Sequence, residues 1–446
     1  MSGDSPSPLL AAPQTSPRPH RPMGPAGVAW FLFFFFRELL VNLPGMLRLR
    51  HHRRLQDPVS ENPRVVCVSD NLDEVNGIAL ASRIQLRELR RLGYAAWLYG
   101  VAFHTRPPRR EGAGDALTLA PGVYSVNQAG YANSELAIPR LKTFIDFLRD
   151  NEIDLIEFET PGPVSHLCLA VAKVAGIPTV SHYRTDIITY SETLIKFRLG
   201  VAFVQFWTRL FTRNAGPVIV PSEAYRAKVA IMGIKNDAIH KLPRGVDLTA
   251  FHPSRRDENF WADRGVPSEG FKLLYVGRVS AEKNLAALCG AFLQALEHNP
   301  DLRLITVGEG PWLEEMERRL LPTGRAHFTG VLHGEELATA FASSDLFVFP
   351  SLTDTFGNSV IEALASGLPC LVSDEGGPCE IVTAGVCGDI FRGDESEALS
   401  EGILSLANDP ARLARYREAA RLRASEFTYE AAALAFWNLY LSVLKN

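Results

Sequence analysis

The 446-residue sequence lacks several patterns that define common classes of protein. Its six cysteines include no C-x-x-C pair, which argues against a disulfide framework or a zinc site and fits a reducing compartment. No Asp-x-Asp tripeptide occurs, so the usual carboxylate pair for holding a divalent ion beside a diphosphate is missing. No uninterrupted apolar run reaches the roughly 20 residues that span a bilayer. We therefore expect no metal and no cofactor.

The net charge of −4 conceals a basic N-terminus on an acidic body. Residues 1–54 contain seven arginines and only two acidic residues, so the remainder of the chain is acidic. A nucleic-acid-binding protein would carry its basic residues on a folded domain, and we expect no nucleic-acid partner. A basic terminus instead suits attraction to an anionic membrane surface.

Residues 1–26 contain seven prolines and are predicted to be a disordered tail. Residues 27–56 are predicted to form a membrane-associated helix. Its apolar run, Gly27–Phe36, is too short to span a bilayer, and Arg37 and Glu38 interrupt any longer span. A helix lying in the interface fits this pattern best, which predicts peripheral or monotopic attachment at the cytoplasmic face. A true span, a signal peptide and a helix docked on protein remain alternatives. We also expect that deleting residues 1–54 leaves a folded, soluble protein.

From Arg64 onward, short apolar runs alternate with amphipathic segments, which predicts an α/β protein with parallel sheets. The first series of predicted strands comprises Val65–Ser69, Ala95–Gly100, Ile153–Phe158, Thr179–Tyr183 and Val218–Ser222. The second series comprises Lys272–Gly277, Arg303–Gly308, Leu346–Ser351 and Pro369–Asp374.

An irregular, proline-punctuated stretch separates the two series. The predicted organisation is a first Rossmann-like domain at 60–245, a linker at 246–270, a second Rossmann-like domain at 271–426, and a C-terminal helix at 427–446 that crosses back to the first domain. Two doubly wound domains would face each other across a cleft. Ligands in such folds bind beyond the carboxyl ends of the strands.

The segment YVGRVSAEKN, Tyr275–Asn284, places Arg278 and Lys283 in a loop directly after a predicted strand. A departing nucleotide diphosphate concentrates negative charge, and two cations can hold it without a metal. Two solvated basic residues in a surface loop would give the same pattern.

The segment Ser351–Asp374 contains Asp354 and Glu362, with a glycine turn and a predicted helix start between them. Backbone amides of about Gly357–Val360 would form a helix N-terminus that can receive phosphate. Glu362 in the helix can accept ribose hydroxyls, and Asp354 in the loop can hold sugar hydroxyls. A capped helix with surface acids is the simpler alternative.

These two segments together resemble the large group 1 family of retaining GT-B glycosyltransferases, which includes bacterial GDP-mannose-dependent lipid mannosyltransferases and sulfoquinovosyl-lipid synthases. The likeness runs from about Val65 to the end of the chain. Further matching segments are DEVNGIA (Asp73–Ala79), VPSE (Val220–Glu223), LPRGVDLTAFHP (Leu242–Pro253), VGEGP (Val307–Pro311) and GGPCEIV (Gly376–Val382).

The resemblance implies that Asn76 and Gly77 form an N-domain loop over the donor. It assigns the diphosphate to Arg278 and Lys283 and the ribose to Glu362. The implied donor site consists of Asn76, Gly77, Gly277, Arg278, Lys283, Asp354, Gly357, Asn358, Ser359 and Glu362.

The chain departs from the family pattern at two positions. Asp354 stands where the family has its first glutamate, facing the donor sugar. Arg184 stands where the family tends to have a histidine, after the fourth strand, and His182 lies two positions earlier. Arg184 can stabilise leaving-group charge but cannot act as a general base. The predicted catalytic residues are Arg278, Lys283, Asp354, Arg184 and His182.

A further apolar stretch, Phe197–Phe211, places Phe203, Phe206, Trp207 and Leu210 on one helical face. Acceptor-lipid or membrane contact is one interpretation of this face. A buried core helix is the interpretation that we favour from the sequence.

The sequence thus predicts a retaining, metal-independent glycosyltransferase that moves a hexose from a nucleotide-diphosphate sugar, with GDP-mannose favoured over a UDP-sugar, to a membrane-lipid or lipid-linked acceptor, either a lipid or a glycan. One alternative is a catalytically inactive scaffold that binds nucleotide or partners at the membrane. Another is a nucleotide-sugar epimerase or a phosphorylase on the same fold.

Overall fold

The computed structural model describes most of the chain beyond the proline-rich start. The residues described are 25–54, 62–70, 72, 77–102, 116–127, 135–184, 186–188, 191, 198–393 and 395–445. The predicted disordered tail lies outside them except for its last two residues. The chain divides into two compact units. We call residues 25–243 with 432–445 the N-terminal unit, and residues 244–431 the C-terminal unit.

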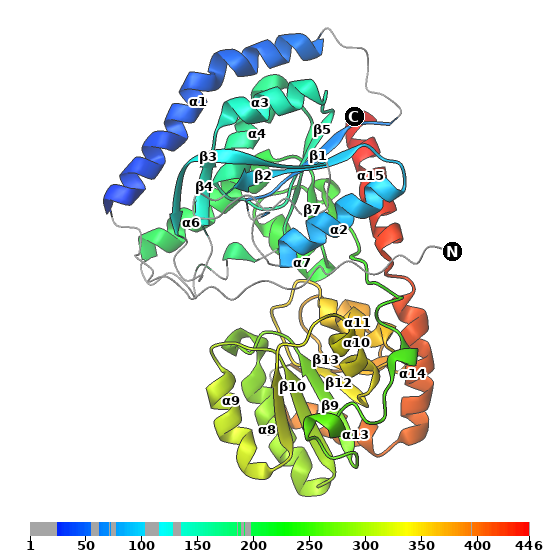
Figure 1. The fold of residues 1–446 in the computed structure, drawn as a ribbon. Coiled ribbons are helices and arrows are strands. Elements are labelled where there is room, and N and C mark those ends of the chain that lie inside the picture. The colour runs from blue at the N-terminus through cyan, green and yellow to red at the C-terminus, as the bar shows by residue number, and fades with distance from the viewer. Residues whose placement is uncertain are drawn as a thin grey trace. The chain divides into compact units, whose positions relative to one another are not determined.

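The sheet of the N-terminal unit has eight strands in the order β4-β3-β2-β1-β5-β6-β7-β8 (Figure 1). They are β1 (Val65–Val68), β2 (Ala96–Ala102), β3 (Leu117–Asn127), β4 (Glu135–Pro139), β5 (Leu155–Phe158), β6 (Thr179–His182), β7 (Val218–Val220) and β8 (Ile239–Lys241). The β3–β4 pair is antiparallel, and the other pairs are parallel. Parallel pairs require long crossovers, which the helices supply.

Helices cover both faces of this sheet (Figure 1). They are α1 (Pro25–Arg54), α2 (Gly77–Arg91), α3 (Leu141–Asp150), α4 (Pro163–Ala175), α6 (Arg198–Asn214), α7 (Glu223–Ile231) and α15 (Tyr429–Lys445), with one 3-10 turn, η2 (Asn236–Ala238). Val66 and Val68 pack with α1, α3, α4 and α6, whereas Val65 and Cys67 pack with α2 and α15. Successive strand residues point to opposite faces, so β1 supplies both cores.

Helix α1 has the length and composition of a membrane span, yet one of its faces packs on the N-terminal unit. Phe35, Met46 and Leu49 are buried there. The buried Glu38 carboxylate accepts a hydrogen bond from the backbone N of Leu141 at 3.0 Å. A carboxylate at the start of α3 satisfies an amide that the helix itself leaves unpaired. Glu38 therefore has a partner on the protein.

The docking of α1 revises one expectation. Deleting residues 1–54 would uncover the apolar side chains against which α1 packs, and would leave the start of α3 uncapped. The remainder is therefore expected to lose stability rather than to behave as an intact soluble protein.

Helix α6 contradicts the preference for a buried core helix. Phe203, Phe206 and Leu210 are exposed, and Trp207 is half-buried. The core-facing side of the helix is formed by Thr208, Phe211 and Thr212 instead. The helix is apolar on two faces, and the periodicity of one face does not reveal which of them packs inward.

The C-terminal unit has a six-stranded sheet in the order β11-β10-β9-β12-β13-β14 (Figure 1). Its strands are β9 (Phe271–Val276), β10 (Leu302–Val307), β11 (Ala326–Gly330), β12 (Leu346–Phe349), β13 (Cys370–Ser373) and β14 (Gly388–Phe391). All of these strands pair in parallel. The order reverses between β9 and β12, which is where doubly wound sheets bind ligands beyond the carboxyl ends.

The helices of this unit are α8 (Leu285–His298), α9 (Leu313–Leu320), α10 (Gly334–Ala342), α11 (Asn358–Ala365), α12 (Pro378–Ile381), α13 (Ser396–Ala407) and α14 (Pro410–Ala424). Short 3-10 turns are η3 (Pro253–Arg255), η4 (Ala262–Arg264), η5 (Ala281–Lys283) and η6 (Leu321–Thr323). The predicted linker, 246–270, packs on this unit, since Val246, Trp261 and Val266 are buried in its core. Helix α15 begins in the C-terminal unit and continues in the N-terminal unit from Ala432.

Each of the nine predicted strands coincides with an observed strand, and the parallel α/β architecture is confirmed. Strands β3, β4, β8, β11 and β14 were not predicted. β3 contains the turn-like pair Pro121–Gly122, and β8, β11 and β14 have only three to five residues with few apolar side chains.

Candidate functional site

Arg278 follows β9 in a loop that the VGEGP segment, Val307–Pro311, holds in place. Gly277 N donates to Val307 O at 3.0 Å. A side chain at Gly308 would place its Cβ 2.0 Å from Gly277 O, so only glycine permits this approach. The Arg278 side chain is exposed. Among the described residues, it has no ion-pair or side-chain hydrogen-bond partner, which leaves the guanidinium available for an anion.

Lys283 and Asp354 come together from loops that are 71 positions apart in the sequence. Lys283 Nζ donates to both carboxylate oxygens of Asp354, each at 2.9 Å. The next residue, Asn284, donates its side-chain amide to Pro350 O at 3.3 Å and to Gly393 O at 2.6 Å. These bonds fasten the loop after β9 to the loops after β12 and β14, so the two predicted donor segments lie together at this edge of the sheet.

Gly357 precedes α11 in the left-handed region, with φ of +100°. A Cβ at this position would lie 3.1 Å from Pro378 Cγ, and one at Gly377 would lie 2.3 Å from Thr355 O. The GGPCEIV segment therefore packs closely behind the turn that starts the helix. Asn358 and Ser359 begin α11, whose first amides lack acceptors within the helix and point toward its N-terminal end. This is a suitable receptor for a phosphate group.

Glu362 lies one turn into α11 and is half-buried. Desolvation raises the pKa of its carboxyl group to about 7. In the described part of the chain, its carboxyl group forms no ion pair or hydrogen bond. A carboxylate without a protein partner can accept two vicinal hydroxyl groups, as the ribose assignment requires.

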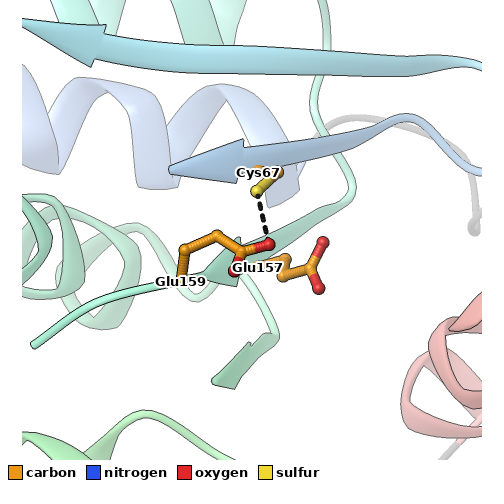
Figure 2. A group of neighbouring side chains, drawn as sticks. All are labelled: Cys67, Glu157 and Glu159. Atoms are coloured by element: carbon orange, nitrogen blue, oxygen red, sulfur yellow. Dashed lines mark hydrogen bonds between the residues drawn. The ribbon is translucent and has the colours of Figure 1, made fainter. Parts of the chain in front are cut away.

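The N-terminal unit has a different arrangement at the carboxyl end of its sheet. Figure 2 shows Cys67 of β1 with Glu157 of β5 and Glu159 directly after it. All three are buried, and Cys67 Sγ donates to Glu159 Oε1 at 3.4 Å. Burial raises the pKa of Glu157, an effect that hydrogen bonds from Tyr440 and Gln85 oppose.

The two predicted catalytic residues of this unit are bound to these glutamates. Arg184 is buried and forms a two-pronged ion pair with Glu159, in which Nη2 donates to Oε1 at 2.7 Å. Burial opposes the charge on Arg184, but the adjacent carboxylate raises its pKa overall. His182 is buried as well, and its Nε2 contacts Glu157 Oε1. Both side chains thus lie buried inside the N-terminal unit.

Metal-ligand atoms of Cys67, Glu157 and Glu159 lie within 4.8 Å of one another. The carboxylates already have donors, because Arg184 neutralises Glu159 and Tyr440 OH donates to Glu157 Oε2 at 2.7 Å. A metal here would have to compete with a buried guanidinium. The cluster therefore fits a structural polar network that joins α15 to the sheet better than it fits a metal centre.

The predicted loop over the donor is only partly described. Asn76 lies outside the described residues, and Gly77 is the first residue of α2. Gly77 therefore lies in the segment that follows β1, at the N-terminal end of α2.

Sequence reasoning missed Glu157, Glu159, Gln85 and Tyr440 as parts of a network. The signal was two acids at alternate positions in an otherwise apolar run, LIEFE (Leu155–Glu159). Charged residues are rarely fully buried without a partner, so such a pattern indicates cations nearby in the fold.

The two doubly wound α/β units define the fold as GT-B. The cationic loops and the helix that begins after a glycine, at the carboxyl edge of the second sheet, indicate a glycosyltransferase. Comparisons with known proteins identify its family. Residues 256–423 match the model for glycosyl transferases group 1, and residues 75–250 match the model for glycosyltransferase family 4. The chain belongs to this family of GT-B glycosyltransferases.

Curated relatives include enzymes that act with GDP-mannose. A GDP-mannose-dependent alpha-mannosyltransferase of Mycolicibacterium smegmatis is 33% identical over 328 residues, covering 72% of this chain and 82% of the relative. The corresponding protein of Mycobacterium tuberculosis is 31% identical and covers 79% and 90%. A sulfoquinovosyl transferase of Arabidopsis thaliana is 30% identical and covers 64% and 56%.

Solved structures share the fold at lower identity. A sucrose-phosphate synthase from Thermosynechococcus elongatus has a TM-score of 0.70 at 20% identity, covering 86% of this chain and 99% of that one. An Anabaena protein solved in complex with UDP has a TM-score of 0.66 at 20% identity, covering 85% and 100%.

Proposed function

We propose that this glycosyltransferase moves a hexose from a nucleotide-diphosphate sugar to a lipid or lipid-linked acceptor, with GDP-mannose as the favoured donor. The donor preference is supported by relatives at 31–33% identity whose names specify GDP-mannose. The observation that carries the proposal is the joined pair of loops in the C-terminal unit, where Lys283 meets Asp354 beside the start of α11.

Each part of this edge has a chemical task in the proposed reaction. Arg278, Lys283 and the first amides of α11 stabilise the charge that grows on the leaving diphosphate. Glu362 binds the ribose. Asp354 holds hydroxyl groups of the donor sugar, and its pairing with Lys283 keeps the two groups at a fixed separation.

The proposal includes retention at the anomeric carbon and no requirement for a metal. Two cations and a helix N-terminus provide the positive charge that a divalent ion supplies elsewhere, and the sequence has no Asp-x-Asp pair. A front-face reaction, in which the leaving phosphate helps to deprotonate the acceptor, needs no strong protein base. This agrees with the pairing of Arg184 and His182 to buried glutamates.

The acceptor assignment is supported by relatives named for lipid products. They include an alpha-monoglucosyldiacylglycerol synthase of Streptococcus pneumoniae at 24% identity, covering 73% of this chain and 74% of the relative. The docked helix α1 presents Trp30, Phe33 and Phe36 outward and carries Arg48 and Arg50 further along. We propose peripheral attachment to the cytoplasmic face of a membrane through this helix.

A donor panel tests the function. Full-length protein is incubated with radiolabelled GDP- and UDP-sugars and membrane extract, with and without EDTA. We expect label from GDP-mannose in the lipid fraction at the same rate in EDTA, and an α-linkage in the product by NMR coupling constants.

Other results would support the alternatives. Nucleotide binding without turnover of any donor would indicate an inactive scaffold. Donors interconverted without an acceptor, or turned over only with free sugar phosphate, would indicate an epimerase or a phosphorylase.

A further inference from the structure

Helix α6 carries an apolar surface that the described part of the chain leaves exposed. Phe203 and Phe206 are 54% and 60% exposed, and Leu199 and Leu210 are exposed beside them. An isolated apolar side chain on a surface needs no explanation, but two phenylalanines and two leucines on one helix form a patch.

This patch adjoins the outward face of α1. Trp207 of α6 contacts Phe35 of α1, with ring centroids 5.5 Å apart, and also stacks on Phe203 at 5.6 Å. Figure 1 shows the N-terminal half of α1 and helix α6 at the same side of the N-terminal unit. Phe36, which follows Phe35, is exposed. The two helices therefore meet along an aromatic seam with exposed aromatic side chains on both sides of it.

The exposed charged side chains of these two helices are all basic. The only acidic residue in either helix is Glu38, which is buried and engaged with the start of α3. Arg198 and Arg209 of α6 and Arg48 and Arg50 of α1 are exposed. Exposed aromatic and aliphatic side chains flanked by arginine are the composition of a surface that enters the headgroup region of an anionic bilayer.

We propose that α6 and the outward face of α1 form one composite docking surface for an anionic lipid bilayer, so that the N-terminal unit is held by two helices rather than by α1 alone. A protein partner of ordinary composition would offer acids to only some of these arginines, whereas anionic lipid offers negative charge along the whole surface. The proposal rests on the proposed function for its purpose, which is to hold the enzyme against a lipid acceptor.

Vesicle binding by purified full-length protein tests the proposal. The variant Phe203→Ser/Phe206→Ser removes the apolar patch of α6 without touching a buried residue. We expect it to bind vesicles of phosphatidylcholine and phosphatidylglycerol at least about 10-fold more weakly than the wild type. Arg198→Gln/Arg209→Gln is expected to weaken binding to these vesicles by about 10-fold and to leave binding to pure phosphatidylcholine unchanged.

A matched control is Ile231→Ser, because Ile231 is 86% exposed at the end of α7 in the same unit. It should bind like the wild type. Unchanged binding of the double phenylalanine variant, with circular dichroism showing that it is folded, would overturn the proposal. So would a wild-type dimer in vesicle-free buffer that the same variant converts to monomer, since a second copy would then cover the face.

The readout separates this inference from the proposed function, because vesicle binding is measured without a donor. A wild-type protein that binds vesicles through α6 but turns over no nucleotide-sugar would refute the function and leave the docking surface established. If the wild type transfers sugar to a lipid acceptor but Phe203→Ser/Phe206→Ser binds vesicles normally, the docking surface is refuted and the proposed function stands.

Discussion

The two units use the carboxyl edge of the same kind of sheet in opposite ways. In the C-terminal unit, Arg278 is exposed and Glu362 has no protein partner among the described residues. In the N-terminal unit, Glu157 and Glu159 are buried, and protein donors bind both. Charged residues occur at both edges, so the presence of charge does not distinguish them. What distinguishes them is whether the charge is already satisfied by the protein.

This difference assigns the residues different tasks. A charged side chain that a protein partner already neutralises contributes to the fold as part of an ion pair. Removing one member of a buried pair lowers the free energy of unfolding. A charge that remains available can bind a ligand, at some cost to the stability of the empty protein. Arg278 and Glu362 are therefore expected to affect donor binding and turnover, and Arg184 and Glu159 are expected to affect stability.

The largest expected effect is on stability in the N-terminal unit. Glu159→Gln leaves Arg184 buried without its countercharge, which should lower the free energy of unfolding by about 3–5 kcal/mol. Urea unfolding measures this change. Glu315→Gln is the matched control, since Glu315 pairs with Arg318 on the surface of α9, and this variant should unfold at nearly the same urea concentration as the wild type. Equal losses of unfolding free energy in the two variants would contradict the structural role of the buried Glu159–Arg184 pair.

The next effect is on turnover in the C-terminal unit. Arg278→Ala or Lys283→Ala should lower the rate of sugar transfer by on the order of 10²-fold or more, because each removes a stabiliser of the leaving diphosphate. Arg278→Ala should leave the melting temperature unchanged, since its side chain is exposed. The exposed Arg318→Ala serves as the control. Full activity in both loop variants would contradict the diphosphate assignment.

A smaller effect concerns pH and the two carboxylates. Since the pKa of Glu362 is raised to about 7, its folded carboxyl keeps a proton that the unfolded chain releases from about pH 4.5 upward. The free energy of unfolding therefore falls as the pH rises from about 4.5 to about 7. Binding of GDP-mannose, which requires the carboxylate, should strengthen by up to about 10-fold between about pH 6 and 8. Calorimetric titration measures the dissociation constant.

Glu362→Gln should bind the donor more weakly and lose this pH dependence. Asp354→Asn should lower the transfer rate with less effect on donor affinity, because the role proposed for Asp354 is to hold the sugar rather than the nucleotide. Identical losses of affinity in the two variants would argue against separate ribose and sugar roles.

The sequence predicted the sheets and the donor loops because those features are local. The apolar runs of β9 and β12 and the residues directly after them are contiguous, so a local pattern reveals them, whereas the order of strands within each sheet was not predicted. The Lys283–Asp354 pair was not predicted as a contact, although both residues were assigned to one site. Their pairing depends on the bonds from Asn284 that join the loops.

The sequence predicted the N-terminal unit less well because its network is assembled from distant segments. Gln85, Glu159, Arg184 and Tyr440 come from four different elements or loops, and no local pattern relates them. The same holds for α1 and α6. Their apolar residues were visible in the sequence, but which face packs inward depends on neighbours such as the start of α3.

Hydrogen exchange of the wild-type protein with and without GDP-mannose can show which unit binds the donor. We expect the donor to slow exchange of backbone amides in residues 277–284 and 354–362, including the first turn of α11. We expect no comparable change at residues 157–159 and 182–184, which are already buried and paired. Protection confined to the N-terminal segments, with none at the start of α11, would contradict the assignment of the donor to the C-terminal unit.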